Sequence, residues 1–199
     1  MSNEGIDLVE KYVKNIFKDN NTTNFSYHDL VHTQSVVKYA IKIALEDNIS
    51  NEEINLIRIA AWFHDTGYLF NPDNHEEKSC ELAEIFLQKN HFTKSEIDKT
   101  KMIIMATKVP HNPSTNLEKI ICDADLHHLG GTDFYQRNDL YRLELEKTIG
   151  VTFPENEWVS NTIDFLNSHR FFTQYAIKNF EPQKRRYIKE LNRKLKELS

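Results

Sequence analysis

The sequence predicts an all-α fold built as a single domain over residues 1–199, and three observations carry this prediction. Apolar residues recur at spacings of three and four along most of the chain, as on one face of a helix, whereas no alternating run of β-branched residues exceeds a few positions. Only five Gly and five Pro interrupt the chain. Two pairs, Ser50 with Glu53 and Thr93 with Glu96, have the spacing of capping boxes, which open helices.

Polar caps, glycines and first-turn prolines set the boundaries of the predicted helices. In order, we expect a helix over 9–17 that ends in the polar run 19–23, one capped by Ser26, one from Ser50 to about Asp65, one that opens near Asn74 after the turn 67–72, one from Thr93 to about Thr107, one over 117–129 stopped by Gly130 and Gly131 in left-handed conformations, one over 133–148, and two that open at Pro154 and Pro182.

Composition excludes several classes of protein. A net charge of −5 argues against a nucleic-acid binder held by charge. No apolar run approaches 18 residues, and the N-terminus lacks the basic start and apolar stretch of a secretory signal, so we expect no membrane partner and a cytoplasmic location. Cys80 and Cys122 are the only cysteines, each in an apolar periodic segment. They exclude a disulfide framework and are expected to be reduced and buried.

The C-terminal segment 184–199 is basic and carries an apolar stripe. It holds seven Lys or Arg against two Glu. Ile188, Leu191, Leu195 and Leu198 recur at helical spacing along it. We expect a terminal helix that docks by this stripe and leaves its basic face in solvent. A homodimer contact or an anionic partner is the alternative.

Histidine and aspartate gather in three segments. His28 and His32 are four residues apart, which places them on one face if the segment is helical. His64 and Asp65 end an apolar helix, and the apolar run 120–126 carries two further acids. Burying such groups is costly unless they are paired or bind a metal. Each segment alone also fits an ordinary surface or core position, but together they point to one metal site.

The order of these residues resembles the H...HD...D signature of the HD-domain superfamily of metal-dependent phosphohydrolases. His32 is followed after 32 residues by the His64-Asp65 pair, and Asp125 comes 60 residues later. The resemblance covers a motif core of about 26–131. It implies an all-α HD-domain helical bundle, with 132–199 as a helical C-terminal extension.

The resemblance also assigns roles to individual residues. His32, His64, Asp65 and Asp125 correspond to the metal ligands, and Asp65 would in addition be the catalytic carboxylate that bridges two metals. The Tyr-His-x-x-x-His motif looks like that of cyclic-nucleotide phosphodiesterases and many small bacterial hydrolases, in which the first His is the general acid. In this chain that residue is His28.

Two acids compete for the ligand position in the third segment. Asp125 stands in the Ala-Asp-Leu context of the family pattern, and Asp123 lies about 200° away from it on a helix, so the two cannot share one face. Asp125 is therefore the expected ligand, and Asp123 a neighbour of the ligands or a surface residue. Asp29 stands where the phosphodiesterases commonly have Asn, which leaves nucleotide specificity open.

Further residues are candidates for a second metal and for the phosphate. His75 and His111 lie where binuclear members of the superfamily have additional histidines; capping or surface positions are the alternative. Lys108, and less strongly Lys78, are candidates to offset phosphate charge, although solvated lysines are common on any surface. Two imidazoles and two carboxylates suit divalent Mn, Fe, Co, Ni, Zn or Mg. We expect one such site and consider a second.

The sequence therefore predicts a phosphohydrolase that cleaves a phosphoester of a nucleotide or small phosphate metabolite, with metal-activated water and a His general acid. A small-molecule phosphoester is the expected partner. Two alternatives stay open: a di-iron oxygenase on the same scaffold, and a non-catalytic nucleotide-binding module. Phe134, Tyr135 and Tyr141 are candidates to stack a base, although their helical spacing also suits the core.

Overall fold

The computed structural model describes residues 3–20 and 25–198, and every regular element within these ranges is helical. The all-α prediction is thus confirmed. The α-helices are α1 (Asn3–Asp19), α2 (Leu30–Glu46), α3 (Asn51–Phe63), α4 (His75–Lys89), α5 (Lys94–Met105), α6 (Asn116–Asp125), α7 (Phe134–Ile149), α8 (Glu155–Ser168), α9 (Gln174–Asn179) and α10 (Glu181–Glu197), and the short 3-10 helices are η1 (Thr66–Leu69), η2 (Pro72–Asn74) and η3 (His127–Gly130). None of the described helices combines the length and hydropathy needed to cross a bilayer.

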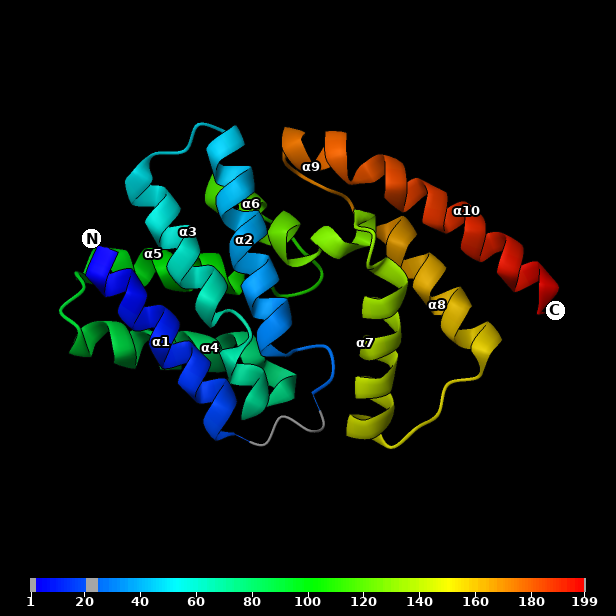
Figure 1. Cartoon of the computed structure of the whole chain (residues 1–199), viewed down its shortest axis with the longest axis horizontal. Helices are drawn as coiled ribbons and strands as arrows, with labels where there is room; N and C mark the ends of the chain where they lie inside the picture. The colour runs from blue at the N-terminus through cyan, green and yellow to red at the C-terminus, as the bar shows by residue number, and fades with distance from the viewer. Residues whose placement is uncertain (1–2, 21–24, 199) are drawn as a thin grey trace.

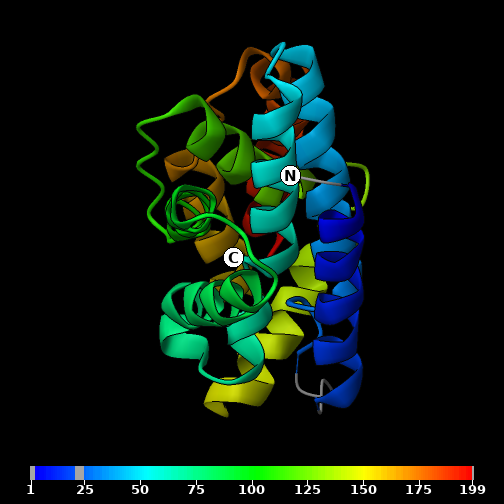
Figure 2. The same ribbon diagram turned by 90° about the vertical axis from the view of Figure 1, so that its left-hand side faces the viewer.

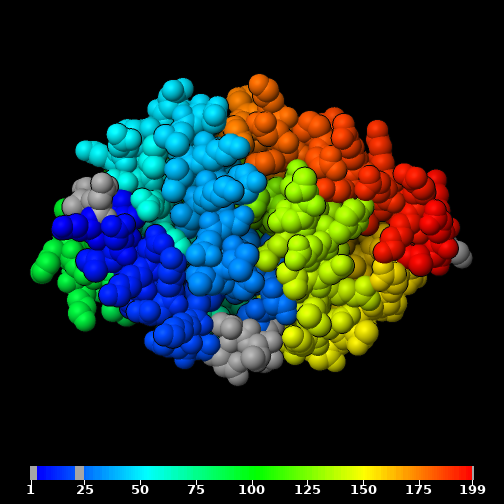
Figure 3. All heavy atoms as spheres, in the orientation of Figure 1, coloured from blue at the N-terminus to red at the C-terminus, as the bar shows by residue number. Residues whose placement is uncertain are grey.

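The helices form two groups along the long axis of the molecule. Figure 1 shows α1, α3, α4 and α5 towards the end marked N, α7, α8 and α10 towards the end marked C, and α2 and α6 between them. Figure 2, turned by 90°, shows α2 and α3 side by side, in agreement with their extensive contact. One continuous cluster of buried apolar residues runs through both groups, from Val9 in α1 to Leu191 in α10. In the space-filling view, α2 and α7 meet across the middle of the front face (Figure 3).

The start of α2 differs from the prediction. Ser26 is not the cap, because Asp29 takes that position and its Oδ1 accepts a hydrogen bond from His32 N at 2.7 Å. Aspartate is a strong N-cap because its carboxylate satisfies an otherwise unpaired amide of the first turn. His28 therefore precedes the helix and does not share a helical face with His32. The capping boxes at Ser50 and Thr93 are confirmed.

The end of α6 also differs from the prediction. The helix stops at Asp125 and is followed by η3, so it does not continue to Leu129. Gly130 and Gly131 do not adopt a left-handed conformation; among the described glycines only Gly150 does. Gly130 instead permits a close approach, since a Cβ there would lie 2.3 Å from Phe180 O.

Asp123 ties α6 to the C-terminal group. It is fully buried, so the surface position considered for it is excluded. Its carboxylate accepts hydrogen bonds from Phe172 N at 2.9 Å and from Thr173 N at 2.7 Å. Burial outweighs these hydrogen bonds and raises the pKa of Asp123 to about 6. The residue thus fixes the segment between α8 and α9 against the helix that carries Asp125.

Several other boundary and packing predictions can be compared with the structure. Helix α8 follows Pro154 directly and α10 has its proline in the first turn, as predicted, whereas α9 was not anticipated. The polar run 19–23 lies partly outside the described residues. Leu191 is buried, Ile188 and Leu195 pack on the core, and Leu198 remains 42% exposed, so α10 docks by most of its stripe. Both cysteines are free and buried, as predicted.

Candidate metal centre

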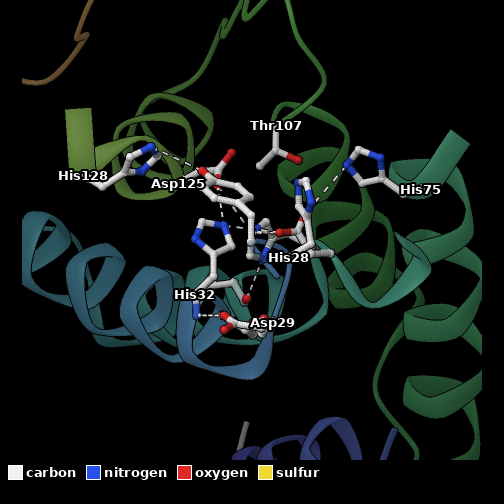
Figure 4. A network of polar contacts seen from close by, with 12 residues as sticks. His28, Asp29, His32, His75, Thr107, Asp125 and His128 are labelled. Atoms are coloured by element: carbon white, nitrogen blue, oxygen red, sulfur yellow. Dashed lines mark hydrogen bonds and ion pairs between the residues drawn. The ribbon is translucent and has the colours of Figure 1, made fainter. Parts of the chain in front are cut away.

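Four side chains from three separate elements meet at one point. His32 lies in the first turn of α2, His64 and Asp65 follow directly on α3, and Asp125 is the last residue of α6. One ligand atom from each lies within 4.8 Å of all the others, and all four atoms belong to buried groups. Figure 4 shows His32 and Asp125 facing each other, with Asp29 bonded to the backbone of His32 below them.

The polar atoms of the four side chains lie within contact distance of one another. His32 Nε2 lies 3.0 Å from Asp125 Oδ1 and 3.3 Å from Asp65 Oδ2. His64 Nε2 lies 3.0 Å from Asp65 Oδ2, yet neither atom makes a hydrogen bond although both are buried. His64 Nδ1 donates to Ala61 O at 2.9 Å, which leaves Nε2 with its lone pair. Buried polar atoms normally have a hydrogen-bond partner, and these two, one on an imidazole and one on a carboxylate, have none within the described part of the chain. Both are atoms that bind divalent cations.

The electrostatics of the cluster favour positive charge. Burial lowers the pKa of His64, but the charge of Asp65 and contacts with Asp125 outweigh burial and raise it well above its usual value. The pKa of His32 is raised for the same reasons. Burial raises the pKa of Asp65, but His64 and His32 outweigh this effect and hold it well below its usual range. Two ionised carboxylates beside two imidazoles are what a divalent cation requires.

The turn after α3 is held rigidly by α4. Ser79 Oγ donates to His64 O at 2.6 Å and accepts from Gly67 N at 2.9 Å. A Cβ on Gly67 would lie 2.1 Å from His75 O, so only glycine allows α4 to approach the turn this closely. Thr66 Oγ1 donates to Phe63 O and closes the helix end. These contacts fix the His64-Asp65 pair beside the first turn of α2.

The cluster lies at the wall of a pocket of about 570 Å³, which is within the usual range for small-molecule sites. Asp65 and Asp125 line the pocket together with His28 and His75. Residues of α7 and α8 line it as well. The two carboxylates of the cluster therefore border a space that a small molecule can enter, while His32 and His64 lie behind them.

Comparison with known proteins agrees with this geometry. The chain matches the sequence pattern of the HD domain over residues 29–130, just over half of its length. The chain belongs to the HD-domain family. No curated protein matches it at a significant level. The match spans the four clustered residues and ends before α7.

Solved structures share the HD-domain fold over nearly the whole chain. A predicted HD superfamily hydrolase from an uncultured Thermotogales bacterium is 22% identical, with 97% of this chain and 92% of that chain covered and a TM-score of 0.64. YpgQ of Bacillus subtilis, in complex with ADP, is 16% identical, with 98% and 95% covered and a TM-score of 0.67. A protein from Lactobacillus plantarum is 14% identical, with 100% and 98% covered and a TM-score of 0.73. These likenesses include α7 to α10, beyond the HD match.

A residue outside the HD match completes the surroundings of His28. Glu144, fully buried in α7, contacts His28 Nδ1 with Oε1 and accepts hydrogen bonds from Tyr27 N at 2.7 Å and His28 N at 3.0 Å with Oε2. Burial raises the pKa of Glu144, but these contacts outweigh it and hold the pKa below its usual value. The His28 ring stacks on Tyr68, with centroids 3.8 Å apart. The imidazole is thus fixed by a carboxylate behind it and an aromatic ring beside it.

Sequence reasoning missed Glu144, and no local signal could have found it. It stands in the segment Leu143-Glu144-Leu145-Glu146, which reads like any amphipathic helix. Its partner is 116 residues away in the chain, so only the tertiary fold brings the two together.

The two candidate ligands of a second metal, His75 and His111, differ in their distance from the four clustered residues. His75 Nε2 lies 3.7 Å from Asp65 Oδ1 and 3.4 Å from Glu76 Oε1, on the pocket wall. His111 Nε2 contacts Thr107 O at 3.1 Å, and it is not among the described residues that line the pocket. The structure therefore places His75, but not His111, next to the carboxylate of Asp65.

The two lysines and the three aromatics are placed as follows. Lys108 lines the pocket and pairs with Glu77 at 2.5 Å, whereas Lys78 pairs with Glu81 at 2.8 Å and lines a separate shallow depression. Phe134 and Tyr141 line the main pocket. Tyr135 does not; it donates to Glu190 Oε2 at 2.8 Å and packs beside Tyr187.

Proposed function

We propose that this HD-domain protein is a metal-dependent phosphohydrolase that cleaves a phosphoester of a nucleotide or related small molecule. The single observation that carries the proposal is the meeting of two imidazoles and two carboxylates, buried, with ligand atoms within 4.8 Å, at the wall of an accessible pocket. Burying two carboxylates and two imidazoles in contact is costly when no cation binds them. Such a cluster therefore indicates a binding role and not a role in stabilising the core.

His32, His64, Asp65 and Asp125 would hold a divalent cation, for which the mixed nitrogen and oxygen set suits Mn, Fe, Co, Ni, Zn or Mg. A cation at such a site offsets phosphoryl charge and makes water a stronger nucleophile near neutral pH. The protein keeps the ligands in place through the contacts of Ser79 and Asp29 described above. Because the ligands are held by three separate elements, the site depends on the fold and not on one segment.

His28 is the proposed general acid, which protonates the leaving alkoxide. It lines the pocket, its Nδ1 side is occupied by Glu144, and Nε2 is the nitrogen left to transfer a proton. Glu144 is a positioning residue, because it acts on the substrate only through His28. A buried carboxylate in this position fixes the tautomer and the orientation of the ring.

Two observations support a nucleotide-type substrate. The pocket is large enough for a nucleotide, and the structurally similar YpgQ of Bacillus subtilis was solved with ADP. Lys108 lies at the pocket wall and is the proposed contact for the phosphate. It would leave its ion pair with Glu77 to bind the phosphate.

The proposal is tested by loading purified protein with Mn, Co, Ni, Zn or Mg and screening phosphomonoesters, cyclic nucleotides and nucleoside diphosphates for phosphate or nucleoside release. We expect turnover with at least one metal. His28→Ala should retain the metal and lose turnover, because a positioned general acid contributes about 10² to 10⁴ in rate. Nucleotide binding without turnover under every metal would contradict the proposal and favour a binding module.

An oxygenase with two irons is the second candidate, and the position of His75 beside Asp65 favours it. Asp65 and His75 would then help to hold a second iron beside the first. Two irons per chain and a product that forms only in the presence of oxygen would establish this alternative. A single metal per chain and full turnover under nitrogen would exclude it.

A further inference from the structure

The pocket continues beyond the metal centre into a region between α7 and α8 that the proposed chemistry does not use. Its walls there include the aromatic rings of Tyr141, Phe153, Trp158 and Phe165 and the amides of Asn138 and Asn161. We call these six residues the α7–α8 sector. All of them lie outside residues 29–130, so the sector is separate from the HD match. The two helices lie near each other at the right of Figure 1.

Flat apolar surfaces dominate the sector. The ring of Trp158 stands 5.5 Å from Phe153 and 6.2 Å from Tyr141, centroid to centroid, and is tilted by 50° against each, so the three rings form one aromatic cluster. Tyr141 and Phe165 remain 38% and 37% exposed while lining the pocket. Exposed aromatic faces in a concave site favour a flat ring as ligand, because stacking on such faces is favourable for any π-system.

The sector contains one buried donor without a partner in the described part of the chain and a side-chain amide near it. Trp158 is only 7% exposed, yet its Nε1 donor has no hydrogen-bond partner among the described residues. The side-chain amide of Asn138 lies 3.3 Å from Thr162 Oγ1, whose single proton is also directed at Trp158 O at 2.8 Å, so the amide keeps hydrogen-bonding capacity at the pocket wall. A buried donor without a partner is unfavourable until a ligand supplies an acceptor. An acyl chain would leave the Trp158 donor unpaired, whereas a heterocycle carries acceptors at its edge.

We propose that the α7–α8 sector binds a planar heteroaromatic ring of the substrate, of which a nucleobase is the type, while the phosphate lies at the metal centre. The position of the phosphate rests on the proposed phosphohydrolase function, but recognition of the ring does not. The sector, and not the HD motif, then determines which phosphoesters the protein accepts.

The first test uses ligands that cannot be hydrolysed. The chain has two tryptophans, Trp62 in the core and Trp158 in the sector, so Trp62→Phe makes Trp158 the sole emitter. Adenosine and ribose differ only in the base. Titrated into the full-length, metal-loaded protein, adenosine should quench Trp158 and ribose should not. Calorimetry on the unsubstituted protein gives the same comparison if Trp62→Phe does not fold.

The second test uses variants on the exposed side of α8. Asn161→Ala and Phe165→Ala remove sector side chains, and Asn167→Ala, exposed on the same helix and outside the pocket lining, is the matched control. We expect the two sector variants to weaken adenosine binding about tenfold, as loss of one stacking or hydrogen-bonding group does. The two sector variants should lower kcat/KM for adenosine 5′-monophosphate and leave kcat/KM for ribose 5-phosphate unchanged. The control variant should leave both values unchanged.

The outcomes separate this proposal from the proposed function. Equal binding of adenosine and ribose, or equal kcat/KM for the two phosphates, overturns the sector while hydrolysis stands. Selective adenosine binding that Asn161→Ala and Phe165→Ala weaken supports the sector even if no phosphoester is cleaved under any metal, a result that overturns the hydrolase instead. Binding of an acyl phosphate in place of adenosine also overturns the sector.

Discussion

The two ends of the molecule contribute to the site in different ways. The group α1 to α6 supplies all four residues of the metal cluster, whereas α7 and α8 supply Glu144 and the α7–α8 sector. The first set belongs to a motif with fixed spacing, and the second consists of side chains that meet the site only after folding. Under the proposed function, the HD portion would supply the chemistry, and the C-terminal portion would position His28 through Glu144 and contact the rest of the substrate.

The largest effect is expected where the two ends differ most, in metal binding. His64→Asn should abolish bound metal and turnover, because a ligand imidazole that is fully buried cannot be replaced by a shorter side chain. Elemental analysis after dialysis and the rate of phosphate release provide the measurement. His91→Asn, at an exposed position with positive φ that Asn tolerates, is the control. Full metal content in His64→Asn would contradict the proposal that the clustered residues of the HD portion bind the metal.

The next effect concerns the contribution of α7 to proton delivery. Glu144→Gln preserves shape but removes the charge behind His28, so kcat should fall about 10- to 100-fold while metal content stays the same. The rate should respond in kcat rather than in KM, and the pH profile should change shape. Asp139→Asn, exposed on the same helix and outside the pocket lining, serves as the control. If Glu144→Gln leaves the pH profile of kcat unchanged and only lowers the free energy of unfolding, Glu144 has a structural role and does not position His28 for proton transfer.

A smaller effect is expected at the junction of the two ends. Asp123→Ala leaves the amides of Phe172 and Thr173 without their acceptor, which should lower the free energy of unfolding by about 1 to 3 kcal/mol. Urea denaturation measures this loss, with the exposed Asp164→Ala on α8 as control. A change no larger than that of the control would show that the C-terminal group is held by its apolar contacts alone.

The smallest effect is the contribution of one C-terminal histidine to the pH dependence of stability. Burial and the neighbouring Lys184 lower the pKa of His169 to about 3, below its unfolded value of about 6.5. Between these values the unfolded chain binds the proton more readily, so stability falls as the pH decreases below 6.5. By pH 5 the loss should be at most about 2 kcal/mol. His169→Asn, which can retain an acceptor for Lys184, should reduce the slope of the profile between pH 7 and pH 5 in thermal unfolding. The slope that remains is expected from His127, whose pKa is lowered by burial to about 4. An equally steep profile would show that His169 does not contribute.

The same division decides what could be read from the sequence. The helical fold, the capping boxes and the four clustered residues follow from local spacing and motif order, and Asp125 follows from its Ala-Asp-Leu context. The start of α2 was misplaced because Ser26 and Asp29 both suit a cap and only the geometry chooses. Glu144 and the partner amides of Asp123 could not be predicted, because contacts across 116 and 50 residues leave no local pattern.

The central claim is that two imidazoles and two carboxylates of this chain bind one divalent cation. X-ray absorption spectroscopy of the cobalt- or manganese-loaded protein tests it directly, since imidazole ligands give a distinctive scattering pattern. We predict two imidazole nitrogens with oxygen ligands in the unsubstituted protein and fewer imidazoles in His32→Asn. A bound metal with oxygen ligands alone, identical in both proteins, would contradict the account.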